Sequence, residues 1–162
     1  MAIKEVKEYF AALGMADRVL EFTTSSATVE LAAQTLGVIP ARIAKTLSFM
    51  LSDGPLLIVT AGDAKVDNHK FKETFGCKAK MLSPEEAVEL VGHAVGGVCP
   101  FAVHPGVKTC LDISLKRFDT VFPACGSDNS AIELSCDELF RCSNAMDWVD
   151  VCKAWNDPQQ GE

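Results

Sequence analysis

The chain has 162 residues, of which 48% are hydrophobic and 23% charged, and its formal net charge at pH 7 is −7. This size and composition predict one globular domain over residues 1–156, followed by a disordered tail over residues 157–162. Frequent charges at the N-terminus exclude the apolar segment of a signal peptide, and no stretch is long and apolar enough to span a membrane. We therefore expect a cytoplasmic protein without a membrane partner. Its seven irregularly spaced cysteines are then expected to be reduced thiols.

The negative charge is concentrated near the C-terminus. Residues 128–162 carry eight acidic and two basic side chains, whereas residues 61–127 carry eight of each. Within the second range, five lysines outnumber three nearby carboxylates: Lys65, Lys70, Lys72, Lys78 and Lys80 against Asp63, Asp67 and Glu73. This local excess suits a modest contact with the end of a nucleic acid better than the wrapping of a long duplex. A solvated face with mixed charges remains the alternative for any single lysine.

Hydrophobic periodicity, glycines and prolines divide residues 1–92 into elements. Ser83 and Glu86 have the spacing of a capping box at a helix start. The turn residues at 52–55 predict a hairpin between the strands on either side. In chain order, the elements are a helix over 3–13, a strand over 19–24, a helix over 28–36, a turn at 40, strands over 43–51 and 56–61, a helix over 68–75, a strand over 79–82 and a helix over 84–91.

The second half of the chain is richer in strands. Strands are predicted over 107–113, 120–124 and 131–135, and helices over 137–141 and 146–155. These strands are too short and too unevenly joined for a doubly wound sheet. We therefore predict an α+β (mixed α/β) fold in which a curved, barrel-like mixed sheet is flanked by helices.

Lys45 is the most informative residue of the sequence. In a strand over 43–51, the period of two puts it on one face with apolar side chains: Ile43, Leu47, Phe49 and Leu51. Lysines are almost never fully buried unless paired, and an unpaired buried ammonium costs on the order of several kcal/mol. Lys45 is thus expected to meet a structural carboxylate, a site open to water or an anionic ligand. The alternative is a strand-end lysine whose stem lets the ammonium reach solvent.

Two loops complete a candidate site. Residues 93–101 include Gly96 and Gly97, which let the backbone approach a ligand closely, and Pro100, which fixes the loop exit. Residues 124–130 form a turn-rich connection that offers backbone amides and hydroxyls. Taken separately, either loop could equally be a plain turn.

Six motifs in order give these features a common interpretation. They are Ala44–Leu47, Thr60–Asp67, Met81–Glu86, Val95–Phe101, Leu111–Asp112 and Ala124–Ser127. Together they resemble the signature of the YbaK/ProX family, free-standing aminoacyl-tRNA deacylases related to the editing insertion domain of bacterial prolyl-tRNA synthetases. The resemblance covers about residues 29–139 and implies a barrel-like mixed sheet flanked by helices.

The resemblance also implies a reaction and a set of site residues. The substrate would be tRNA mischarged with a small amino acid such as alanine or cysteine, most plausibly on proline tRNA. The partners would be the 3′ end of that tRNA and, in addition, an aminoacyl-tRNA synthetase. No cofactor or metal is implied. The implied catalytic set is Lys45, Gly96, Gly97 and Pro100. The implied substrate-binding set is Thr46, Val98, Cys99, Phe101, Asp112, Gly126 and Ser127.

Lys45 matches the essential lysine of the family and would bind the anionic tRNA terminus or the developing oxyanion. Gly96 to Pro100 matches a Gly-x-x-x-Pro loop whose backbone would orient the ester and the attacking water. Because the ester is already activated, hydrolysis needs positioning and charge stabilisation more than a strong nucleophile. Whether Asp112 touches the substrate or only supports the site is open at this point.

Other interpretations of the same residues remain open. Cys99 with His93 or His104 has the residue types of a thiol nucleophile and its base, but no third orienting group is evident. Those three residues and Cys110 are spaced too evenly for a compact metal-binding knuckle. A different class of function is a non-catalytic module that binds aminoacyl-tRNA 3′ ends or another adenosine-phosphate ligand.

Overall fold

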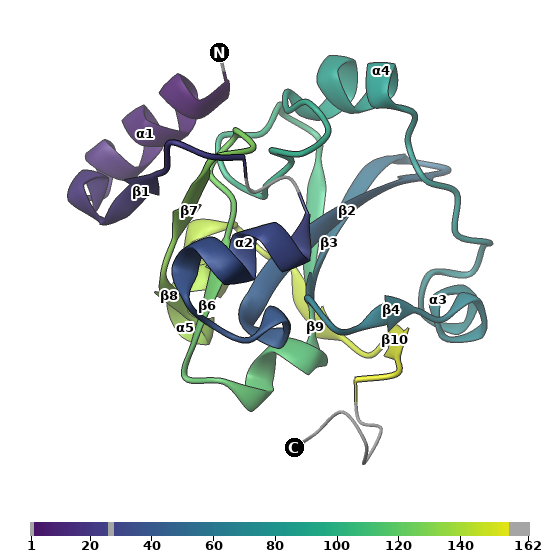
Figure 1. Ribbon diagram of the computed structural model, residues 1–162. Helices are drawn as coiled ribbons and strands as arrows, with labels where there is room; N and C mark the ends of the chain where they lie inside the picture. Colours follow the sequence, from purple (N-terminus) through teal and green to yellow (C-terminus); the bar gives the residue numbers. More distant parts are fainter. Residues whose placement is uncertain (1, 26–27, 156–162) are drawn as a thin grey trace.

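The structure is a computed structural model that describes residues 2–25 and 28–155 (Figure 1). At its centre is a mixed sheet that curls into a half-barrel. Six strands cross this sheet in the order β8 (Leu134–Ser135), β6 (Thr120–Pro123), β2 (Ile43–Leu51), β3 (Gly54–Ala61), β5 (Lys108–Asp112) and β9 (Asp147–Val149). Two further pairs of strands are β1 (Val19–Glu21) with β7 (Ser130–Ile132), and β4 (Lys65–Val66) with β10 (Cys152–Lys153).

The pairing of the strands fixes the position of Lys45. β2 and β3 form the predicted antiparallel hairpin, in which Lys45 stands opposite Thr60. β2 also pairs in parallel with β6, and β3 pairs in parallel with β5. Lys45 therefore lies in a strand that has a hydrogen-bonded neighbour on each side, near the middle of the sheet.

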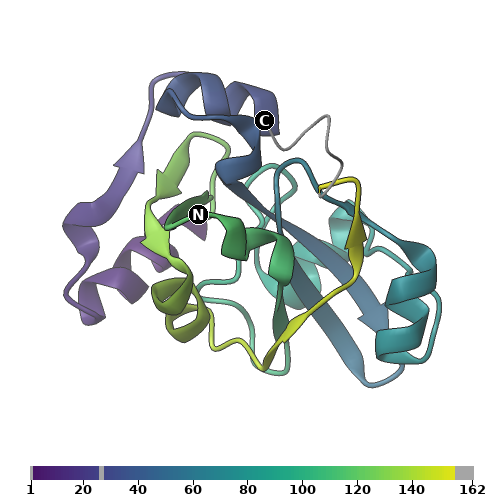
Figure 2. The same cartoon turned by 90° about the horizontal axis from the view of Figure 1, so that it is seen from below.

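Five α-helices surround the sheet: α1 (Ala2–Ala12), α2 (Val29–Leu36), α3 (Asn68–Phe75), α4 (Pro84–Glu86) and α5 (Cys136–Cys142). α1 and α3 lie at opposite sides of the molecule, and α3 is next to the β4–β10 pair (Figures 1 and 2). This architecture confirms the predicted α+β fold with its curved mixed sheet. In the described part of the chain, no helix is both long and apolar enough to cross a membrane.

Local capping signals account for the helix boundaries that the sequence predicted. The Thr28 hydroxyl accepts a hydrogen bond from Leu31 N, and Gly37 ends α2 in the left-handed conformation with a φ of 71°. Ser83 and Glu86 form the predicted capping box at α4. A π-helical turn (Ala87–Val91) then extends this helix to Gly92.

Two predicted elements are wrong. Residues 146–155, predicted as a helix, instead contain β9 and β10, because both segments find partners far away in the sequence: β5 and β4. Residues 79–82, predicted as a strand, make only an isolated bridge between Met81 and Phe49. The tail predicted over 157–162 lies outside the described residues.

Both faces of β2 are covered. Phe49 is 2% exposed and packs against Phe71 of α3, with ring centroids 5.0 Å apart. On the opposite face, Ala44 and Ser48 are also buried. The prediction that one face carries the apolar side chains is therefore incomplete, because the second face is also shielded, and residues from both faces of the strand line a cavity.

Candidate active site

A cavity of about 250 Å³ lies against β2 and is closed by segments from four other parts of the chain. α2 contributes one wall, and the remaining walls come from residues 81–87, from the loop that contains Gly96, and from residues 122–131. The lining residues are Thr28, Val29, Ala32, Leu36, Ile43, Ala44, Lys45, Thr46, Leu47, Ser48, Met81, Leu82, Ala87, Val95, Gly96, Val98, Phe122, Ala124, Ser130 and Ala131.

The lining is mostly apolar, and the only charged side chain among these described residues is Lys45. Ligand pockets of this kind orient a substrate through a few polar groups set in an apolar wall. Pockets for drug-sized molecules usually have about 300–1,000 Å³. The smaller volume here suits a small acyl group rather than a whole nucleotide.

The ammonium of Lys45 is partly buried and lacks a direct anionic partner. Burial lowers the pKa of Lys45, because loss of hydration disfavours the charged form. The carboxylates of Asp63 and Glu30 act against this shift. Within residues 2–25 and 28–155, however, neither carboxylate forms an ion pair with Lys45.

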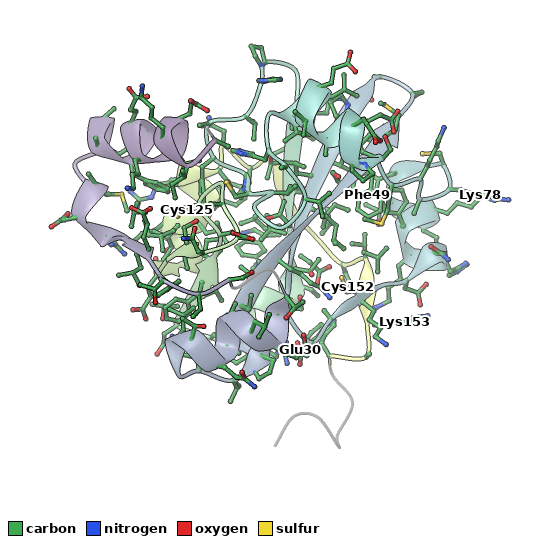
Figure 3. All side chains as sticks on the ribbon, turned by 45° about the horizontal axis from the view of Figure 1, so that its top comes forward. Glu30, Phe49, Lys78, Cys125, Cys152 and Lys153 are labelled. Atoms are coloured by element: carbon green, nitrogen blue, oxygen red, sulfur yellow. The ribbon has the colours of Figure 1, made fainter. Side chains whose placement is uncertain are left out.

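The nearest candidates for such a partner are occupied or uncharged. Asp63 is held by Arg117, whose Nη1 and Nη2 donate to its two carboxylate oxygens at 3.0 and 2.6 Å. The thiol of Cys152 is buried, and burial raises its pKa well above neutrality, so it carries no charge at physiological pH. Figure 3 shows Glu30 on α2, whose carboxylate acts to raise the pKa of Lys45, and the uncharged Cys152 on β10. The Lys45 ammonium is thus available to an anionic group of a ligand.

The loop that contains Gly96 supplies backbone to the cavity. Gly96 has a φ of 97°, in the left-handed region that favours glycine, and its lack of a side chain means that only backbone atoms line the cavity there. Val95 and Val98 line the same wall, and Val95 is 69% exposed. Backbone groups at this position can therefore approach a bound ligand.

Close glycine contacts hold the two predicted loops together. A Cβ atom on Gly97 would lie 2.6 Å from the backbone nitrogen of Ser127 and 2.7 Å from the carbonyl carbon of Gly126. Ser127 Oγ is 2.8 Å from both Asn129 Oδ1 and Ser130 Oγ, which stabilises the second loop internally. Gly97 thus packs directly on the backbone of the second loop.

The predicted site residues divide into two groups. Lys45, Thr46, Gly96 and Val98 line the cavity. The others are outside its lining: Gly97, Cys99, Pro100, Phe101, Asp112, Gly126 and Ser127. From the second loop, the flanking residues Ala124 and Ser130 line the cavity in place of Gly126 and Ser127. The wall from α2 was missed, because its stripe of Val29, Ala32 and Leu36 has the pattern of ordinary core packing.

Asp112 lies outside the cavity lining and supports segments next to the site. It is fully buried, and its Oδ1 and Oδ2 accept hydrogen bonds from the backbone nitrogens of Val151 (2.9 Å) and Ser114 (3.0 Å). Ser114 Oγ in turn accepts a hydrogen bond from Ala61 N in β3, at 3.1 Å. These contacts connect the ends of β3 and β5 to the segment that leads into β10. They place Asp112 in a positioning role.

The structure disfavours a thiol nucleophile at Cys99. The side chain is fully buried outside the cavity lining, and burial raises the pKa of its thiol to about 12. His93 Nε2 lies 3.5 Å from Cys99 Sγ, but it is 2.8 Å from the carbonyl oxygen of Phe101, to which a protonated Nε2 donates. Burial also lowers the pKa of His93. The pair has the features of core packing.

The four residues considered as metal ligands do not gather into a site. Among the residues that the structure describes, no group of three or more histidine, cysteine, aspartate or glutamate side chains is placed to hold a metal ion. His104 is instead 3.1 Å from the carbonyl oxygen of Glu89 through its Nδ1.

Residues 23–142 match the family profile of the aminoacyl-tRNA editing domain. The chain belongs to this family. Relatives of this editing domain include YwhH, an uncharacterised protein of Bacillus subtilis (strain 168), which is 56% identical over 156 residues, 96% of this chain and 99% of YwhH. The multifunctional Ser/Thr-tRNA deacylase ProXp-y of Escherichia coli (strain K12) is 33% identical over 87 residues, which make up 52% of each chain.

Structural comparison gives the same result for this editing domain. The crystal structure of a candidate trans-editing enzyme for prolyl-tRNA synthetase matches with a TM-score of 0.85 and 27% identity, over 94% of this chain and 97% of that chain. Stretches of bacterial proline–tRNA ligases also match, but this chain covers only between 15% and 23% of their length. The resemblance to the YbaK/ProX family is thereby confirmed.

Proposed function

We propose that this editing domain hydrolyses the ester of a tRNA that carries a small, wrongly attached amino acid, such as alanine or cysteine, most plausibly on proline tRNA. The observation that carries the proposal is the ammonium of Lys45, which has no ion-pair partner among the described residues and lies in a small cavity whose other described lining residues are uncharged. Two relatives support it: ProXp-y, named as a Ser/Thr-tRNA deacylase, and the candidate trans-editing enzyme for prolyl-tRNA synthetase.

The cavity suits selection by size. A synthetase pocket separates substrates that differ by one methylene by only about 1–3 kcal/mol, so a second site that admits the smaller residue is needed for accuracy. A cavity of about 250 Å³ against β2 admits a small acyl group, while the adenosine that carries it remains at the mouth. Larger correct residues would be excluded by the apolar walls of α2 and Phe122.

The chemistry requires little beyond position and charge. An aminoacyl ester is an activated substrate, so a bound water that is correctly oriented can attack its carbonyl carbon. Lys45 would stabilise the oxyanion that develops, or a phosphate next to it, in a site where partial desolvation strengthens the interaction. Backbone groups at Gly96 would orient the ester from the opposite wall. No cysteine takes part in this scheme.

The test is hydrolysis of a panel of esters by the wild type and by Lys45→Ala. The panel contains alanyl-, cysteinyl- and seryl-tRNA on the proline acceptor, with correctly charged prolyl-tRNA as control. Lys4→Ala, on an exposed position of α1, is the matched lysine control. We expect release of small residues, retention of proline and a loss of about 10²–10³-fold in kcat/KM for Lys45→Ala only.

The opposite result would change the class of function. If the wild type binds these tRNAs and cleaves none of the esters above the spontaneous rate, the domain is a non-catalytic binding module. Lys45 would then be an anchor for an anionic ligand. Equal rates for Lys45→Ala and wild type would remove Lys45 from the mechanism while leaving the hydrolase assignment intact.

A further inference from the structure

Two exposed lysines stand directly opposite each other beside the cavity. β4 and β10 pair in an antiparallel register that matches Lys65 with Lys153 and Val66 with Cys152. Cys152 is fully buried, whereas Lys65 and Lys153 are exposed, on the other face of the pair. Figure 3 shows Cys152 and Lys153 on β10. Side chains at directly opposite positions have Cβ atoms about 4.5–5.5 Å apart, and like charges there are destabilising. The fold thus keeps an unfavourable charge pair at this place.

Within residues 2–25 and 28–155, no carboxylate forms an ion pair with Lys65 or Lys153. Asp63 is bound by Arg117, and Asp150 accepts a hydrogen bond from Lys70 Nζ at 3.1 Å. Asp67 caps α3 by accepting from two backbone nitrogens at 2.9 and 3.1 Å.

The pKa of Asp67 is lowered chiefly by these capping hydrogen bonds and also by the charge of Lys153. The charges around the pair balance, with five cations and five carboxylates: Lys45, Lys65, Lys70, Arg117 and Lys153 against Glu30, Asp63, Asp67, Asp112 and Asp150. In a chain with a net charge of −7, this region therefore lacks the negative excess of the whole protein.

The pair is also next to the candidate active site. Burial is the main reason for the lowered pKa of Lys45, and the charge of Lys65 lowers it further, which places Lys65 within electrostatic reach of the cavity. Lys153 follows Cys152, whose side chain is also within electrostatic reach of Lys45 although its thiol is uncharged at neutral pH. An extended anion that binds Lys45 could therefore also contact Lys65 and Lys153.

We infer that Lys65 and Lys153 form a phosphate-binding surface for the single-stranded 3′ end of the tRNA whose ester enters the cavity. Two exposed cations on a flat strand pair suit a chain of repeating phosphates better than a small anion, which needs an enclosed cradle. The overall negative charge of the protein would repel RNA elsewhere, so this surface would also set the direction of approach. The inference rests on the proposed function, because the occupant is the strand that delivers the ester.

The experiment compares two double variants that remove the same charge. Lys65→Gln/Lys153→Gln neutralises the proposed surface, and Lys4→Gln/Arg141→Gln removes two exposed cations elsewhere, on α1 and α5. Binding of a fluorescent single-stranded RNA that ends in CCA is measured between about 50 and 200 mM salt. Thermal unfolding confirms that both variants are folded.

Two contacts with single-stranded phosphates predict a clear change in salt dependence. The slope of log K against log salt should become shallower by about 1.4 for the Lys65/Lys153 variant, since each contact contributes about 0.7. Its affinity should fall roughly three- to tenfold, as expected for two partly solvated ion contacts. The Lys4/Arg141 variant should keep the wild-type slope. A Lys65→Arg/Lys153→Arg variant, which retains both charges, should bind as the wild type does.

Hydrolysis separates this inference from the proposed function. Aminoacyl-adenosine has no phosphate, so the ratio of kcat/KM on the tRNA ester to kcat/KM on aminoacyl-adenosine should fall for the Lys65/Lys153 variant and not for the control. An unchanged slope and ratio, or a wild type that does not bind the RNA, overturns the phosphate surface even if the ester is cleaved. Loss of RNA binding in a protein that cleaves neither substrate would instead support the surface and reject the hydrolase.

Discussion

Gly97→Ala tests whether the contact between the two loops shapes the active site. The added methyl group would lie 2.6 Å from Ser127 N and 2.7 Å from the carbonyl carbon of Gly126, both of which are backbone atoms. An ordinary contact begins at 3.4 Å, so the loops would have to separate by about 0.8 Å. Overpacking of this kind costs about 1–3 kcal/mol of unfolding free energy.

The same displacement should reduce activity. Gly96 lines the cavity directly beside the altered residue, and a misplacement near 1 Å can cost about 10²-fold in rate. We expect urea unfolding to show the loss of stability, and deacylation of the best small-residue ester to show a fall in kcat/KM of about 10- to 100-fold. The proline ester serves as the specificity control, because a widened cavity would begin to admit it.

Gly106→Ala is the matched control. Gly106 has a φ of 91° and open space around its Cβ position, so alanine there adds backbone strain of about 1–2 kcal/mol without a steric clash. It lies outside the cavity lining and should lose stability but keep its kcat/KM. If Gly97→Ala behaves like Gly106→Ala, or like the wild type, the loop contact does not shape the site and the reasoning is refuted.

Three further outcomes are expected. Lys45→Met should abolish deacylation but raise the unfolding free energy by about 1 kcal/mol near neutral pH, because it removes a desolvated charge. Calorimetry should also show that the stability of the wild type rises at high pH as Lys45 deprotonates, and the variant should lack this rise. Hydrogen bonds from Arg18 lower the pKa of Glu138 to about 2. The ionised Glu138 should therefore contribute about 1–2 kcal/mol to the unfolding free energy above pH 5, and this contribution should be lost as pH falls from about 4.3 to 2. Urea titrations of Glu138→Gln should lack this loss. Cys99→Ala should keep deacylation within about threefold of wild type, since the thiol is buried and protonated, and a loss above about 10²-fold would restore the thiol mechanism.

Local signals made much of the fold predictable. The ends of α2 and the start of α4 follow from neighbouring residues that cap the helix, by bonding its free backbone groups or by ending it in the left-handed conformation. These residues are Thr28 and Gly37 for α2, and Ser83 and Glu86 for α4. The hairpin of β2 and β3 follows from alternation and a short turn. Residues 146–155 could not be assigned in this way, because β9 is fixed only by a parallel pairing with β5. A pairing partner far away in sequence leaves no local signal.

The candidate site was predictable to a similar extent. Lys45 stood out because its charge conflicts with its apolar neighbours in the strand, and the family motifs identified the loop of Gly96. The second loop was also predicted, at residues 124–130, although Ala124 and Ser130 line the cavity rather than Gly126 and Ser127. The wall from α2 has no comparable signal, because an apolar side chain on a cavity wall looks the same in sequence as one in the core. Gly97 and Asp112 were assigned to the site, but their contacts show that they position other groups.

Lys45 has no ion-pair partner in the part of the chain that the structure describes, and this requires a scaffold that does not collapse onto it. An exposed or mobile strand would let the ammonium return to water or find a carboxylate, and the functional charge would be lost. Here β2 has hydrogen-bonded neighbours on both sides, Asp63 is held by Arg117, and the buried carboxylate of Asp112 fixes the end of β5. Each of these contacts removes a way in which Lys45 could be neutralised. The stability of the surrounding sheet thus allows one unfavourable charge to persist until a substrate supplies its counter-charge.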